Sequence, residues 1–200
     1  MKTSIFKRAL IVLAALTLFS FDTPNGWHKA GSNPENYEME IVKAAGNDGK
    51  KAATIKSIEA IEGFGTLMQT CSPDKYKGKQ IKMTGYVKSE NVTDWAGLWL
   101  RVDQPGTRQP LSFDNMYDRA IKGTTEWKKY EILLDVPANA SRIAYGALLA
   151  GPGQIWFDNI KFELVDNADN PPEPDKSVSS DTYNKTETVT DEPANLDFEK

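Results

Sequence analysis

The side chains best suited to bind a ligand lie in the segment Gly97–Asp103, where apolar and polar residues alternate. Successive side chains of a β-strand point to opposite faces, so one face should carry Trp99, Arg101 and Asp103. An indole, a guanidinium and a carboxylate together suit a saccharide, whose rings have flat C–H faces and whose hydroxyls need hydrogen-bond partners. Gly97 should leave open space beside the indole. The other face, expected in the core, carries Leu98, Leu100 and Val102.

Further residues are candidates for the same concave surface. They are Gln69, Asn115, Tyr117 and Arg119. Trp95, in the turn before the segment, is either another stacking residue or an exposed rim residue. A second interpretation places Trp99 in another apolar layer of the protein. Arg101 would then pair with Asp103 or Asp114 and fasten a loop.

The counts of reactive residues exclude several kinds of site. The 200 residues include one cysteine, Cys71, and one histidine, His28, so neither an internal disulfide nor a Cys/His zinc site can form. No nucleophile motif accompanies His28, and no pair stands out among the 28 acidic residues. The formal net charge of −4 disfavours nucleic acid. We therefore expect no enzyme activity and no nucleic-acid partner, with Cys71 as a small core residue.

Short strands separated by turns account for the central part of the chain. Apolar and polar residues alternate from Gln80 to Lys88, and Trp127–Val136 places every second residue from Tyr130 onward on one face. Further strands are expected at Tyr37–Val42, Ala52–Ser57, Gly65–Thr70, Gly97–Val102, Arg142–Leu149 and Gln154–Val165. Gly-Pro and Asn-Asp-Gly turns lie between them. Many short strands without alternating helices predict an all-β fold, a β-sandwich jelly roll.

The N-terminal residues are predicted to be a signal peptide, residues 1–22. Basic residues at positions 2, 7 and 8 precede an apolar run from Ala9 to Phe19, which is shorter than the roughly 20 residues of a membrane-spanning helix. The alternative is an uncleaved N-terminal anchor. We expect export to the periplasm or the extracellular space, with no membrane span after cleavage of the signal.

Composition changes again after the strand-rich domain, predicted at residues 23–165. Residues 166–193 are rich in Pro, Ser, Thr and acidic residues, a composition that favours a disordered, flexible acidic linker. The last residues, Asn195-Leu196-Asp197-Phe198-Glu199-Lys200, restore an alternation. We therefore expect a tail strand at 194–200 that packs back on the jelly roll and completes its sheet.

Three segments occur in an order typical of a known family. They are Gly123–Tyr130, Leu134–Pro137 and Gly153–Ile160, which contain Trp127-x-x-Tyr130, a Val-Pro turn and Trp156-x-Asp158. This order resembles the C-terminal half of carbohydrate-binding-module jelly rolls of the galactose-binding-like superfamily. Gly97–Asp103 with Phe113–Met116 is similar to a bacterial subgroup that is found alone or joined to other domains, including helix-turn-helix regulators. No helix-turn-helix pattern is present, so a regulator role is not expected.

The resemblance also bears on the tail and on a metal site. Members usually begin with a strand like Asn-Leu-x-Phe-Glu, which in this chain occurs at Asn195–Glu199, so the tail is expected to fill the slot of the first strand. The alternative is that the tail is disordered or begins a second repeat. Alternation places Asp158 on the same face as Trp156 and Ile160. The resemblance implies that Asp158 and Glu199 hold a structural Ca²⁺ together with loop carbonyls.

Alternatively, backbone N–H groups or Arg142 donate hydrogen bonds to the Asp158 carboxylate in place of a metal ion.

No cofactor is otherwise required. The function expected from the sequence is an exported, non-catalytic carbohydrate-binding-like module that recognises a glycan, or another small polar ligand, on a concave sheet face. The alternative is a structural or protein-interaction jelly roll without sugar binding.

Overall fold

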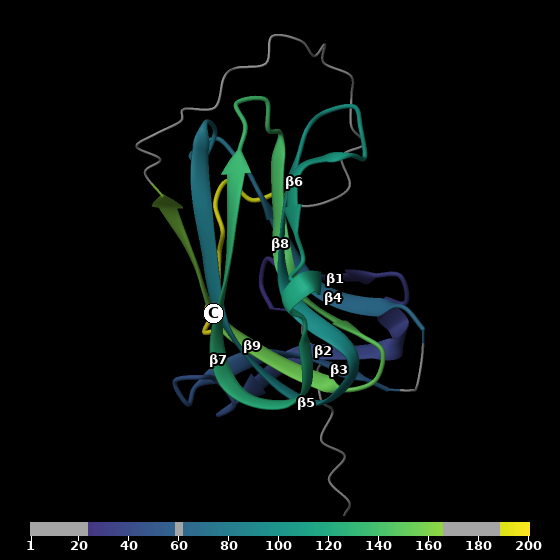
Figure 1. Cartoon of the computed structure of the whole chain (residues 1–200). Coiled ribbons are helices and arrows are strands. Elements are labelled where there is room, and N and C mark those ends of the chain that lie inside the picture. The colour runs from purple at the N-terminus through teal and green to yellow at the C-terminus, as the bar shows by residue number, and fades with distance from the viewer. Residues whose placement is uncertain (1–23, 59–61, 166–188) are drawn as a thin grey trace, which may run out of the picture.

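The chain folds as a β-sandwich jelly roll, as the sequence predicts (Figure 1). The computed structural model describes residues 24–58, 62–165 and 189–200. The predicted signal peptide at 1–22 and most of the predicted linker at 166–193 lie outside the described residues. Within the described part, no helix is long and apolar enough to cross a membrane.

Two antiparallel layers share one long strand, β5. We call the first group of strands layer A: β2 (Tyr37–Lys43), β3 (Lys51–Ser57), β9 (Gln154–Val165), the first half of β5 (Lys79–Asp103) and β7 (Ile121–Val136). Layer B consists of β1 (His28–Gly31), β4 (Phe64–Cys71), β8 (Arg142–Ala150), the second half of β5 and β6 (Pro110–Asp114). Two 3₁₀ helices, η1 (Pro34–Asn36) and η2 (Tyr117–Arg119), lie in the connections.

Strand β5 joins the layers because it bends without losing its pairing. Its 25 residues include the two strands expected at 80–88 and 97–102, and the prediction of a turn between them is wrong. Register shifts against β7 fall between Val87 and Ala96, and Asn91 has a left-handed φ of 52°. Bulges of this kind bend a strand sharply while neighbouring hydrogen bonds persist. Strands β1 and β6 were not predicted from the sequence. They are only four and five residues long.

The core fills the space between the layers. Leu98, Leu100 and Val102 are fully buried there, which confirms the predicted alternation of β5. The predicted core position of Cys71 is also confirmed, and burial raises the pKa of its thiol to about 12. On β7, Ile132 is buried as expected.

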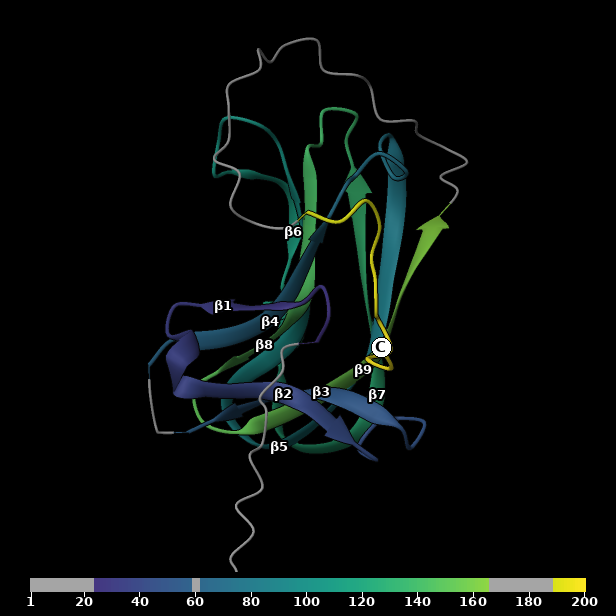
Figure 2. The same ribbon diagram turned by 180° about the vertical axis from the view of Figure 1, so that it is seen from behind.

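The C-terminal tail, residues 189–200, crosses from layer B to layer A and covers the core between them (Figure 2). Backbone hydrogen bonds join Thr190 to Thr70 and Ser72 beside β4, and the Ile160 amide of β9 donates to the Leu196 carbonyl over 3.0 Å. The side chain of Phe198 is 1% exposed. Its ring lies 5.1 Å from that of Trp27 and 5.2 Å from that of Phe157.

The tail is nevertheless not the strand that the sequence predicted at 194–200. It forms a single isolated bridge, between Thr190 and Cys71, followed by turns and bends. Asn195 and Phe198 have left-handed φ angles of 48° and 57°, which a continuous strand does not allow. The Asn195 side chain bonds the Lys200 backbone and closes this compact turn.

Candidate functional site

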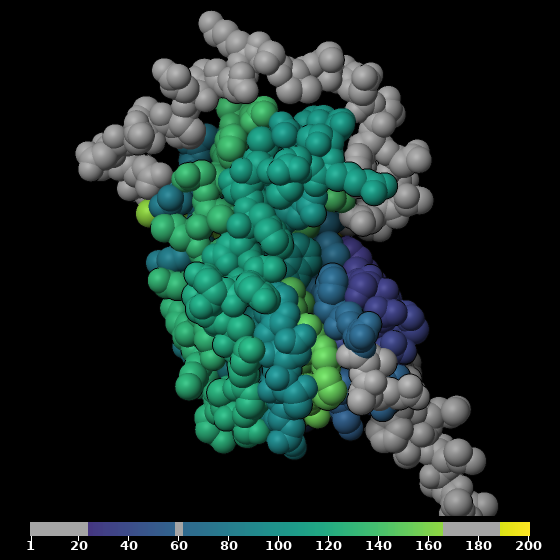
Figure 3. All heavy atoms as spheres, turned by 45° about the vertical axis from the view of Figure 1, so that its right-hand side comes forward, coloured from purple at the N-terminus to yellow at the C-terminus, as the bar shows by residue number. Residues whose placement is uncertain are grey.

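A cavity of about 580 Å³ lies on the outer face of layer B, away from the core. Outward-facing residues of β1, β4, β8 and β5 form its floor, and the segment from Arg108 to Asn115 forms one wall. Figure 3 shows this flank of the molecule, where teal residues around β6 meet the purple and blue strands β1 and β4. The hollow therefore opens between segments that are far apart in the sequence.

Trp99 is the central residue of the floor. Its side chain is 8% exposed, and it packs with Ala144 and Leu148 in a cluster separate from the main core. The indole N–H donates to the Thr66 Oγ1 over 2.8 Å, and the Thr66 hydroxyl donates to the Ala147 carbonyl over 2.7 Å. Trp99 thus belongs to a second small apolar layer, as the second interpretation of the sequence predicts. This layer also lines a cavity, as the ligand-binding interpretation requires.

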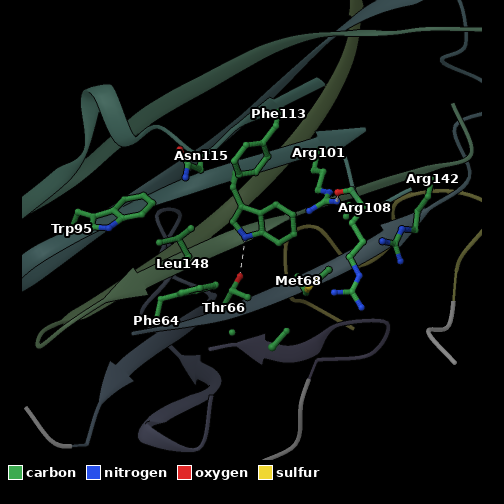
Figure 4. Close-up of a pocket in the computed structure, with 14 residues that line it drawn as sticks. Phe64, Thr66, Met68, Trp95, Arg101, Arg108, Phe113, Asn115, Arg142 and Leu148 are labelled. Atoms are coloured by element: carbon green, nitrogen blue, oxygen red, sulfur yellow. Dashed lines mark hydrogen bonds between the residues drawn. The ribbon is translucent and has the colours of Figure 1, made fainter. Parts of the chain in front are cut away.

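Aromatic side chains gather at one end and along the rim of the cavity (Figure 4). Trp95 is half-buried, and its ring meets that of Tyr117 edge-on with 5.3 Å between the centroids. Phe113 is 50% exposed and Phe64 37% exposed. Exposed apolar side chains that gather beside a hollow often mark a surface that binds a partner or ligand.

Arginine side chains lie at the opposite end of the cavity (Figure 4). Arg101 Nε donates to Asp103 Oδ1 over 2.6 Å, while Arg142 Nη2 and Nε donate to Asp103 Oδ2 over 2.9 and 3.1 Å. Arg101 Nη2 also donates to the Arg108 carbonyl over 2.7 Å, so Arg101 does fasten the β5–β6 loop. Asp103 is 5% exposed and is not among the lining residues, which makes it a counter-ion beneath the cavity.

The prediction of open space beside Gly97 is wrong. A Cβ added to Gly97 would lie 3.0 Å from the Asn115 carbonyl oxygen and 3.1 Å from the Met116 Cβ, so these neighbours already fill the space. The close approach lets the 114–116 segment pack on β5 and brings Asn115 into the cavity wall. The Asn115 side chain also accepts a hydrogen bond from the Tyr117 amide.

The prediction that Gln69 lines the concave surface is wrong. On β4, Thr66 and Met68 face the cavity, so Gln69 one residue further points into the protein and is fully buried. Its Oε1 accepts hydrogen bonds from the Tyr145 hydroxyl and the Ala194 amide, and its Nε2 donates to the Ala194 carbonyl over 2.8 Å. Gln69 therefore anchors the tail.

Tyr117 and Arg119 lie outside the main cavity, beside a shallower depression of about 430 Å³. Arg119 donates to both carboxylate oxygens of Asp114 and to the Glu131 carbonyl, which fixes the connection between β6 and β7. Tyr117 is 70% exposed and supports the ring of Trp95. Arg119 thus fastens a loop, and Tyr117 extends the aromatic rim.

Several lining residues were not predicted from the sequence. They are Phe64, Thr66, Met68, Arg108, Phe113, Arg142 and Leu148. The alternation of β8, which places Arg142, Ala144 and Leu148 on one face, was a usable signal. Arg108 lies in a loop, and nothing in its local sequence indicates that it reaches the cavity.

Asp158, the predicted metal ligand, lies across the molecule in layer A and is 1% exposed. Its Oδ2 accepts from the Asn47 amide over 3.0 Å and its Oδ1 from the Asn159 amide, so backbone N–H groups satisfy it and Arg142 does not. Burial raises the pKa of this carboxyl to about 6, and the nearby Asp48 and Glu199 carboxylates add to the rise.

The predicted face of Asp158 is wrong in part. The left-handed Asn159, with φ 53°, breaks the alternation of β9, so that Ile155 and Phe157 face the core before it and Ile160 after it. Asp158 is instead covered by the loop around Gly46 and by the tail, whose Glu199 accepts from the Lys51 amide.

Oxygen atoms converge in front of Gly46. A Cβ on Gly46 would lie 2.4 Å from the Lys51 carbonyl oxygen, 2.9 Å from Asp158 Oδ2 and 3.1 Å from Asp48 Oδ1. Hard oxygen donors of this kind fit Ca²⁺, provided that backbone carbonyls complete the set. Within the described residues, no three Asp, Glu, His or Cys side chains form a metal cluster on their own.

Comparison with known proteins gives one curated relative and many structural neighbours. No family model matches the chain. The uncharacterised HTH-type transcriptional regulator YbfP of Bacillus subtilis (strain 168) is 40% identical over 177 residues, which cover 88% of this chain. The chain spans 57% of the length of that regulator. The described residues form strands and two 3₁₀ helices, with no helix-turn-helix among them.

The structural neighbours include xylan-binding modules. The CBM22-1–GH10 modules of Clostridium thermocellum xylanase 10B, complexed with xylohexaose, align with a TM-score of 0.55 at 15% identity, covering 75% of this chain and 28% of that one. The CBM22-1 xylan-binding domain of Paenibacillus barcinonensis Xyn10C aligns with a TM-score of 0.51 at 18% identity, covering 73% and 90%. The chain shares the jelly-roll fold of these modules. At these identities the likeness establishes the jelly roll alone.

Proposed function

We propose that the protein is a non-catalytic module that binds a saccharide in the cavity on the outer face of layer B. The observation that carries the proposal is the composition of the cavity, in which an aromatic floor and rim adjoin hydrogen-bonding side chains. Sugar rings combine flat C–H faces with many hydroxyls, so a site that offers both kinds of partner suits them. The volume of about 580 Å³ accommodates a short oligosaccharide.

Different parts of the cavity have different tasks. Trp95 and Phe113 offer exposed ring surface for stacking, whereas Trp99 is mostly buried and shapes the floor. Asn115 and the arginine end supply polar partners for hydroxyls. Support comes from the fold, which this chain shares with xylan-binding domains.

Two further proposals concern the setting of the module. We propose export, to the periplasm or the extracellular space, on the basis of the basic and apolar N-terminal residues.

We also propose a structural Ca²⁺ beside Asp158, Asp48 and the Lys51 carbonyl, with Glu199 adjacent, on the basis of the converging oxygen atoms. When bound, the ion would supply positive charge between carboxylates that otherwise repel one another.

The test is a glycan array and calorimetric titration of the purified protein, its Trp95→Ala variant and a Trp156→Ala control. Trp156 is a partly buried tryptophan of layer A, outside the cavity, under the Lys88 ammonium. We expect saccharide binding to fall at least tenfold in Trp95→Ala and to persist in Trp156→Ala. An intact fold that binds no glycan would contradict the proposal and favour a protein-interaction module.

A further inference from the structure

The charge of the cavity is opposite to that of the protein. The whole chain carries a formal net charge of −4, yet the cavity is lined by Arg101, Arg108 and Arg142 and by no acidic residue. The carboxylate that bonds two of these arginines is that of Asp103, which is buried. A cationic end on an acidic protein concentrates anions at one place on the surface.

Part of the positive charge at this end of the cavity is open to a ligand. Arg101 and Arg142 both donate to the carboxylate of Asp103. Arg108 carries a further positive charge, because its exposed side chain forms no ion pair with any residue that the structure describes. The side chains of Arg101 and Arg142 remain 33% and 19% exposed, so a ligand can reach their outer edges.

The arrangement of the arginines suits a carboxylate. The Asp103 bonds and the Arg108 carbonyl fix Arg101 in place, so little side-chain entropy is lost when a ligand binds. A guanidinium presents paired N–H groups whose geometry matches the two oxygens of a carboxylate. The hydroxyls of a neutral sugar can use these donors but bring no negative charge to balance that of Arg108.

We propose that the bound saccharide is acidic and carries a uronic-acid carboxylate. The carboxylate lies against Arg101, Arg108 and Arg142, while the neighbouring sugar ring packs towards Trp95 at the opposite end (Figure 4). This inference rests on the proposed saccharide-binding function and specifies its ligand class.

The test compares three hexasaccharide probes by calorimetry: hexagalacturonate, its fully methyl-esterified form and neutral xylohexaose. The esterified probe keeps the rings and hydroxyls and removes only the charges. We expect hexagalacturonate to bind at least tenfold more tightly than its ester, with an affinity that falls as salt rises.

Two variants locate the effect. Arg108→Gln removes an exposed charge that supports no described ion pair, so the fold should persist. We expect about a tenfold loss for hexagalacturonate and a much smaller loss for neutral probes, because the Gln amide still offers hydrogen bonds to hydroxyls but no charge. Lys122→Gln removes an exposed charge from β7, outside the cavity, and should change neither.

The outcomes separate this inference from the proposed function. Equal binding of the acid and its ester, unaffected by Arg108→Gln, would overturn the acidic ligand and leave saccharide binding standing. Binding of a sulfated oligosaccharide but of no uronate would overturn the carboxylate assignment. If no probe binds the folded protein and the glycan array is also empty, the proposed function itself fails.

Discussion

At the scale of single residues, the cavity depends on one hydrogen bond that connects β5 to β4. The Trp99 indole donates to Thr66 Oγ1, and the Thr66 hydroxyl donates to the Ala147 carbonyl on β8. One hydroxyl thereby links an aromatic floor residue of β5 to the two neighbouring strands, β4 and β8. Thr66 is 4% exposed, so water cannot easily replace it.

We predict that Thr66→Val, which keeps the shape of the side chain, lowers the free energy of unfolding by about 1–3 kcal/mol, since the indole N–H then has no acceptor. Urea denaturation followed by tryptophan fluorescence measures this loss. The matched control is Thr54→Val, which removes an equally buried hydroxyl in layer A. Saccharide binding should weaken in Thr66→Val and not in Thr54→Val; equal binding in both would contradict the role of the bond.

Cys71 supports a second prediction at this scale. Burial raises the pKa of its thiol to about 12, so the folded protein should resist iodoacetamide at pH 8.5 and react only after denaturation. Above the unfolded-state pKa, roughly 8.5, the unfolded chain releases this proton while the folded one keeps it. The folded state then binds more protons, and the thiol's contribution to stability falls as pH rises from about 9 towards 12.

The measurement is the free energy of unfolding between pH 8 and pH 10.5 for the wild type and for Cys71→Ala. The variant should show a shallower decline over this range, although it is less stable throughout because it leaves a small cavity. Parallel declines in the two proteins, or rapid labelling of the native thiol, would contradict the assignment.

At the scale of elements, strands were predictable from the sequence where alternation is regular and less so where the backbone departs from it. The Gln154–Val165 strand is observed with the predicted bounds. The faces within it were not predictable, because the left-handed Asn159 reverses the alternation at one residue. The prediction for β5 was wrong for a similar reason. Bulges let the strand continue through a segment whose sequence is typical of a turn.

The same reasoning explains which site residues the sequence could supply. Trp99 and Arg101 follow from alternation within one regular strand and line the cavity. Gln69 required the register of a different strand, and an error of one residue there reverses the face. Arg108 reaches the site through loop geometry, which local patterns do not encode.

The tail supports a prediction about its own element. Phe198 inserts between Trp27 and Phe157, so Phe198→Ala should lower the free energy of unfolding by about 3–5 kcal/mol, as for other buried phenylalanines. Val189→Ala, at a residue 48% exposed in the same tail, should change it by less than about 0.5 kcal/mol. Similar thermal stability of the two variants would show that the tail does not close the core in solution.

At the scale of the whole molecule, the C-terminal tail, the Gly46–Lys51 loop and β9 meet around one acidic region. The Glu199 carboxylate accepts from the Lys51 amide, and the Lys51 ammonium donates to the Glu199 carbonyl. Asp158 approaches from β9 beneath them, and Asp48 from the loop. Burial raises the pKa of Asp158, and repulsion from the Asp48 and Glu199 carboxylates adds to the rise.

A calcium ion at this place would bridge β9 and the loop at Gly46–Lys51 and lie beside the tail, and it would stabilise only the folded state. We therefore predict that millimolar Ca²⁺ raises the melting temperature at pH 7.5 and that a chelator reverses the rise, whereas equal Mg²⁺, which holds its water shell, has a smaller effect. Asp48→Asn, at an exposed carboxylate, should reduce the Ca²⁺ shift without unfolding the protein. If the melting temperature is the same with Ca²⁺ and with chelator, the hydrogen bonds from Asn47 and Asn159 satisfy Asp158 without a metal, and the tail is held by Phe198 and its hydrogen bonds.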